Sequence, residues 1–161
     1  MILIFVETHF TTLQNMANLN QSVYSISKTE WGDDIPTQED SSWVIYNSYR
    51  LYKIPFRDYN PEDIRFSLGQ DICPEILVPL ALEILEREGA FFEAENYEGD
   101  LILSAMRLED DFWKLHGLQK QRIKNLILKN QHLYEDRHAF AEVVGLKEVR
   151  QEIKELMERF I

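Results

Sequence analysis

The sequence predicts a mainly α protein, built as an irregular bundle of short helices. Apolar residues recur at helical spacing through the second half of the chain, helix-start signals are frequent there, and no fixed-period repeat is present. The chain has 161 residues, of which 45% are hydrophobic and 28% charged, a balance typical of one globular domain. We expect residues 1–17 to form an N-terminal extension or arm and residues 18–161 to form a single helical domain.

The first part of that domain carries weaker signals. Residues 27–42 are rich in turn-forming residues and predict a loop between the N-terminal arm and the main body. Residues 43–52 are rich in aromatic and β-branched residues, which predicts one short strand or extended segment packed on helices. No second segment has comparable strand character, so we expect no extensive sheet.

Clear helix signals begin at Asn60. A cap residue, Pro61 at the first helical position and acids in the first turn predict a helix that runs to about Gly69. The next helix is predicted by apolar residues at helical spacing and ends at Gly89. Pro79 must either kink this helix or begin a new one. The apolar residues of that stripe are Ile76, Leu77, Leu80, Ala81, Ile84 and Leu85.

Two further helix starts and two apolar stripes follow. Asp100 is predicted to cap one helix, and Asp110 with Asp111 to begin and cap the next. The stripes, which we expect to pack against the core, consist of Leu115, Leu118, Ile123, Leu126 and Ile127 in one segment and Val149, Ile153, Leu156, Met157 and Phe160 in the last. The chain therefore has enough amphipathic helices for a bundle.

Negative charge is concentrated in the middle of the chain. The whole sequence has 28 acidic and 17 basic residues, a formal net charge of -11. Residues 61–113 contain 14 acidic and 3 basic residues, whereas residues 114–161 contain 7 acidic and 10 basic residues. Such a field repels nucleic acids and anionic membranes. An acidic middle is either a solvated helix surface or a binding face for a basic partner.

The residue patterns do not predict catalysis. The best metal candidate is the cluster of His132, Glu135, Asp136 and His138, but the six-residue spacing of its histidines places them on different faces of a helix. The segment that begins at Glu93 lacks the ligand spacing of a calcium loop, and no glycine-rich phosphate loop is present. We therefore expect no cofactor, no metal and no enzymatic activity.

The single cysteine and the N-terminus indicate the compartment. Cys73 has no partner for an internal disulfide, which fits a reducing cytoplasm. Its position beside a possible helix start leaves two interpretations, an activated thiol or a buried structural one, and we expect the second. Residues 1–6 are apolar but lack the basic region of a signal peptide, and no apolar run is long enough to cross a membrane.

An ordered series of segments resembles a known family. The segments are Leu19–Ser22, Trp31–Gly32, Tyr52–Tyr59, Pro61–Phe66, Leu68–Gln70, Leu77–Glu83, Tyr97–Leu101 and Phe112–Trp113. Together they resemble the immunity proteins of bacterial contact-dependent growth inhibition (CDI) over about residues 18–115. The resemblance implies a cytoplasmic protein that binds and neutralises the C-terminal toxin domain, commonly a nuclease, of a cognate effector.

A binding face can be predicted from charge. A nuclease presents a basic cleft to its substrate, so an acidic face on the immunity protein would be steered to it. We expect that face to consist of Glu93, Glu95, Tyr97, Glu98, Asp110 and Asp111. For Tyr97 and for Trp113, packing in the core is the expected alternative to exposure.

Two other functions remain open from sequence alone. One is a metal-assisted hydrolase built on the histidine cluster at residues 132–138, which metal analysis would test. The other is an acidic helical adaptor that binds a basic regulatory protein. A toxin-encoding reading frame immediately upstream favours immunity over the adaptor.

Overall fold

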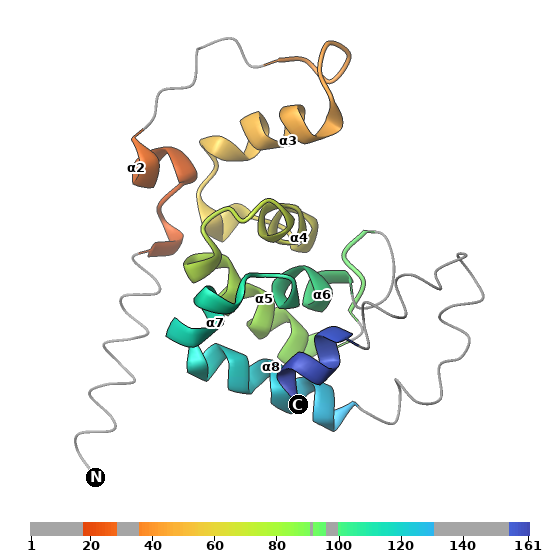
Figure 1. The fold of residues 1–161 in the computed structure, drawn as a ribbon. Helices are drawn as coiled ribbons and strands as arrows, with labels where there is room; N and C mark the ends of the chain where they lie inside the picture. Colours follow the sequence, from red (N-terminus) through yellow and green to blue (C-terminus); the bar gives the residue numbers. More distant parts are fainter. Residues whose placement is uncertain (1–17, 29–35, 91, 96–99, 131–154) are drawn as a thin grey trace.

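The computed structural model describes residues 18–28, 36–90, 92–95, 100–130 and 155–161. Within these ranges every regular element is a helix and none is a strand, which confirms the predicted mainly α fold (Figure 1). The helices are α2 (Val23–Ser27), α3 (Trp43–Tyr52), the 3-10 helix η1 (Phe56–Asp58), α4 (Pro61–Gly69), α5 (Pro74–Glu88), α6 (Asp100–Met106), α7 (Asp110–Leu115) and α8 (Gly117–Lys129). A last helical turn covers residues 155–160.

Helices α4, α5 and α6 pack against one another and form the centre of the molecule. α8 lies against α5, and α7 packs on α8 (Figure 1). The side chains between them are apolar and almost completely buried, among them Ile64, Leu77, Leu82, Leu85, Leu101, Ile102, Ile123 and Ile127. Burial of these aliphatic side chains is the main source of stability.

The predicted start of α4 is confirmed in atomic detail. The Asn60 side chain accepts a hydrogen bond from the Asp63 N–H at 2.8 Å, and the Asp63 carboxylate accepts one from the Asn60 N–H at 3.0 Å. This reciprocal capping box satisfies two backbone donors that the helix leaves free.

α5 is one helix that continues through Pro79, so no new helix begins there. Pro74 occupies its first position, and Gly89 ends it with a φ of 105°, a conformation that side-chain-bearing residues rarely adopt. The predicted end of this helix is therefore confirmed.

The predicted strand at residues 43–52 is wrong, because these residues form α3. Ser42 caps the helix by accepting a hydrogen bond from the Ile45 N–H at 3.3 Å. Leu51 and Tyr52 are buried on one side of its last turn. Packing of that side on the core and the cap at Ser42 outweigh a β-propensity that is weak and dependent on context.

The predicted stripe of residues 115–127 is only partly buried. Ile123, Leu126 and Ile127 lie in the core as expected. Leu115 and Leu118 do not, with 83% and 82% of their surface exposed. The chain leaves helical geometry at His116, so Leu115 belongs to α7 and is not part of the face of α8. Leu118 lies in the first turn of α8, before the buried part of that helix.

The end of the chain closes the bundle. Phe160 is buried and meets the Trp113 ring edge-on, with ring centroids 5.1 Å apart. Leu156 and Met157 are half-buried against the same core. The predicted packing of this last stripe is confirmed for these three residues, while Val149 and Ile153 fall outside the described residues.

Among the helices that the structure describes, none has the length and apolar character needed to cross a bilayer.

Candidate protein-binding surfaces

The predicted acidic residues fall into two groups at opposite ends of α6. Glu93 and Glu95 are exposed just before that helix, and Asp110 and Asp111 are exposed in the first turn of α7, just after it. A seven-residue helix is about 10 Å long, so the two groups are separated along the molecule. Tyr97 and Glu98 lie outside the described residues.

The first group is held in place by a buried carboxylate. Asp100, predicted as a helix cap, is instead the first residue of α6, and its carboxylate accepts hydrogen bonds from the N–H groups of Ala94 and Glu95 at 2.8 and 3.2 Å. This contact fixes the segment that carries Glu93 and Glu95.

One cation borders this first group. Arg65 of α4 lies 3.4 Å from the Glu95 carboxylate and donates to Glu62 at 2.7 Å. The hydrogen bonds to Glu62 raise the pKa of Arg65 above its ordinary value, so this guanidinium stays charged. Glu93 forms no ion pair with any described residue, and the first group therefore keeps a net negative charge.

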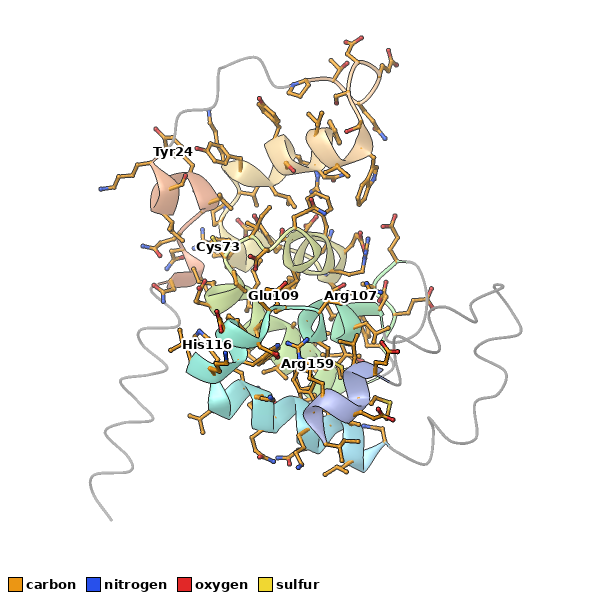
Figure 2. All side chains as sticks on the ribbon, in the orientation of Figure 1. Tyr24, Cys73, Arg107, Glu109, His116 and Arg159 are labelled. Atoms are coloured by element: carbon orange, nitrogen blue, oxygen red, sulfur yellow. The ribbon has the colours of Figure 1, made fainter. Side chains whose placement is uncertain are left out.

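The acids of the second group each have a basic partner within the molecule. Asp110 accepts a hydrogen bond from Arg159 at 2.8 Å, and Asp111 lies 2.7 Å from the Lys114 ammonium. Arg159 also donates to the Met106 carbonyl at 3.2 Å (Figure 2). The helix start predicted at Asp110 is confirmed, but the cap position belongs to Glu109 and neither aspartate caps the helix.

Large apolar side chains are exposed on the first turn of α3. Trp43, Val44 and Ile45 have 44%, 42% and 47% of their surface exposed. The Trp43 ring rests edge-on against Phe66 of α4, with centroids 5.1 Å apart. Sequence reasoning missed this surface because it treated these residues as a strand packed on helices. We call Trp43, Val44 and Ile45 the α3 apolar turn.

The corner between α7 and α8 carries the second exposed apolar group. Leu115 and Leu118 lie on either side of His116, whose ring stacks on Phe112 at a centroid distance of 4.2 Å (Figure 2). Beneath the corner, Trp113 is only 2% exposed, so it belongs to the core and not to a binding face. We call Leu115 and Leu118 the α7–α8 corner.

A shallow hollow lies between the first described residues and α5. Leu19, Ile76, Pro79 and Leu80 provide its apolar lining, and Glu75 and Glu83 also line it. Leu19, Ile76 and Leu80 are partly buried and also pack against the core.

The metal and cysteine candidates can be examined in the described residues. No group of three His, Cys, Asp or Glu residues in the described ranges could hold a metal ion, and the cluster at residues 132–138 lies outside them. Cys73 is half-buried, and burial raises its thiol pKa, which is the opposite of an activated nucleophile. The structural interpretation of this cysteine is therefore favoured.

Comparison with protein families decides the assignment. Residues 28–123 match the family of CDI immunity proteins, and this range is more than half of the chain. The chain belongs to the CDI immunity protein family. No curated protein and no solved structure matches the chain.

The family range includes both exposed surfaces of this CDI immunity protein. It begins after α2, contains α3 to α7 and ends inside α8. The family implies that the chain binds a cognate toxin protein, and it suggests a role without catalysis. The resemblance seen in the sequence is thus confirmed.

Proposed function

We propose that this CDI immunity protein binds the C-terminal toxin domain of its cognate effector in a 1:1 complex and neutralises it. The toxin domain is a nuclease, and the complex covers its active site or an adjoining surface. The family match over residues 28–123 is the observation that carries this proposal. The net charge of -11 supports a basic partner.

Electrostatics gives the complex its speed and selectivity. A nuclease holds phosphates with lysine and arginine, so an acidic protein surface competes with the nucleic acid for the same cations. The proposed acidic contacts are Glu93, Glu95, Tyr97, Glu98, Asp110 and Asp111. Within this set Glu93 and Glu95 contribute most, because Asp110 and Asp111 are already paired with Arg159 and Lys114.

Co-expression tests the proposal directly. The C-terminal domain of the effector encoded immediately upstream is expressed in bacteria with or without this protein, and survival and co-purification are scored. We expect survival and a 1:1 complex. An unrelated CDI toxin domain is the control, because immunity should not extend to it. Death of the cells despite full expression of this protein would contradict the proposal.

We also propose that residues 18–161 act as one cytoplasmic domain and that residues 1–17 are an extension. A chain that starts at residue 18 should then protect cells as well as the full chain does. Loss of protection with unchanged expression would show that the extension takes part in binding.

A further inference from the structure

The α3 apolar turn projects from the body of the protein. Successive residues of an α-helix point about 100° apart, so three consecutive exposed residues cover about 200° of its circumference. α3 is the outermost helix at its end of the molecule (Figure 1). Exposed apolar side chains gathered in this way mark interaction sites more often than isolated ones do.

Several contacts hold the C-terminal half of α3 in place. The Asn47 amide donates to the Trp43 carbonyl at 3.0 Å, and Arg50 forms an ion pair with the buried Asp63 of α4. The Tyr59 hydroxyl donates to the Leu51 carbonyl at 3.0 Å. The first bond lies within α3, and the other two join its C-terminal half to residues 59 and 63. The exposed first turn is supported by the contact of Trp43 with Phe66.

Unpaired acids lie beside the turn. Glu39 and Asp40 precede α3, are exposed and form no ion pair with the part of the chain that the structure describes, and Asp40 accepts a hydrogen bond from the Thr37 hydroxyl at 2.6 Å. On the other side of the turn, two neighbouring residues of α4 make the relevant contacts. Phe66 packs against Trp43 of the turn, and Arg65 forms an ion pair with Glu95 of the first acidic group. The segment of residues 92–95 and the start of α3 lie on the same side of the molecule (Figure 1).

This combination defines the chemistry of the partner. Tryptophan and large aliphatic side chains supply binding energy when water is excluded from them, and a charged border sets orientation and association rate. An acidic border requires lysine or arginine opposite it. A surface of this kind suits a basic protein and disfavours nucleic acid.

Resting on the proposed function, we propose that the α3 apolar turn, bordered by Glu39, Asp40, Glu93 and Glu95, is the surface that docks on the toxin domain. Its occupant is an apolar depression of the toxin surrounded by basic side chains. Trp43, Val44 and Ile45 fill the depression, and the four acids face the basic border.

The test compares two variants, each of which replaces two exposed aliphatic side chains with serine. Val44→Ser with Ile45→Ser removes two of the three exposed apolar side chains of the α3 apolar turn, and Leu115→Ser with Leu118→Ser removes both of those of the α7–α8 corner. Binding to the purified C-terminal domain of the effector encoded immediately upstream is measured by calorimetry. We expect the first variant to raise Kd by at least about 30-fold and the second to change it by less than about 3-fold. Both should unfold at the same temperature as the wild type.

Each other result overturns the inference. If both variants bind like the wild type, the proposed function stands and this surface is wrong. If only the corner variant weakens binding, the docking surface is the α7–α8 corner. If the wild type is a dimer that the α3 variant dissociates without loss of toxin affinity, the turn serves a second copy. If the wild type binds no toxin, the proposed function fails as well.

Hydrogen exchange of the wild-type protein gives an answer even if a variant fails to fold. Slower exchange of the amides of residues 43–48 on addition of the toxin domain supports the proposal. Unchanged exchange there, with slowing elsewhere, overturns it.

Discussion

The α3 apolar turn and the α7–α8 corner both expose large apolar side chains, yet their surroundings differ. The leucines of the corner are almost fully exposed, and the neighbouring Asp111 is paired with Lys114. The side chains of the turn are less exposed, but Trp43 rests on an aromatic ring and Glu39 and Asp40 form no ion pair among the described residues. The two surfaces lie at opposite ends of the molecule (Figure 1).

This difference shows that exposure of apolar side chains does not by itself identify a binding surface. Paired charges have already lost much of their field, so the corner offers apolar contact with little electrostatic direction. The turn offers a supported aromatic anchor and charges that remain available. An immunity protein must reject toxins of other systems, and specificity depends on such directed contacts.

The largest expected effect is on the free energy of unfolding, and it differs between the two tryptophans near these surfaces. Trp113→Ala leaves a cavity under the corner, where the ring packs against Phe160, and should lower the free energy of unfolding by about 3–5 kcal/mol. Trp43→Ala removes a ring that is 44% exposed and should cost about 1 kcal/mol or less. Urea denaturation measures both. Similar losses of unfolding free energy for the two variants would contradict the assignment of Trp113 to the core and Trp43 to the surface.

Second in size is the ion pair that positions α3. Arg50→Ala leaves the Asp63 carboxylate buried without its cation and should destabilise the protein by about 2–3 kcal/mol. The loss is smaller than for a fully buried pair because Arg50 is partly exposed and Asp63 still accepts from the Asn60 N–H. Arg57→Ala is the control, since its pair with Asp58 is exposed and should contribute little. Urea denaturation would contradict this ranking if the two variants were equally stable.

The sequence was sufficient for the parts of the fold that local chemistry controls. The helix cap at Asn60 and the terminating Gly89 occur where predicted, because each depends on residues within one turn. Residues 43–52 were mispredicted as a strand, since the same β-branched and aromatic residues form one buried and one exposed side of a helix. Which side is exposed depends on contacts with Phe66 and Asp63, distant in sequence.

The sequence predicted where acidic residues are concentrated, but not which of them form ion pairs. Asp110 and Asp111 were chosen because acids are dense around them. Their partners differ in origin: Lys114 is one turn away and could have been foreseen, whereas Arg159 is 49 residues away and is brought in by the packing of the last helical turn. The pair of Asp110 with Arg159 depends on the fold, so it could not be predicted by counting charged residues along the sequence.

A third prediction compares the two acidic groups. Glu93→Gln with Glu95→Gln should slow toxin association several-fold at low salt and weaken its salt dependence. Asp110→Asn with Asp111→Asn should change the rate less, because those charges are already paired. Stopped-flow measurements at two salt concentrations test this ranking. A larger effect at Asp110 and Asp111 would show that the acids of α7, and not Glu93 and Glu95, accelerate association with the toxin.

The smallest expected effect concerns the pair that joins α5 to α8 near the corner. Arg122 donates two hydrogen bonds of 2.7 Å to the Glu86 carboxylate, which lowers the pKa of Glu86 below its usual value of 4.5. Because the folded-state pKa is the lower one, the pair stabilises the protein above pH 4.5, and this stabilisation is lost as the pH falls through the folded-state pKa.

Glu86→Gln should therefore cost about 0.5 kcal/mol at pH 7, as exposed pairs do, and the difference from the wild type should shrink in acid. Urea titrations at neutral and acidic pH measure it. Glu88→Gln, whose partner Arg87 is its own neighbour on α5, is the matched control and should show a smaller change. Unchanged toxin affinity in both variants would show that the pair of Glu86 and Arg122 supports the fold without taking part in docking. Weakened binding by Glu86→Gln alone would indicate that this part of the α5–α8 surface contacts the toxin.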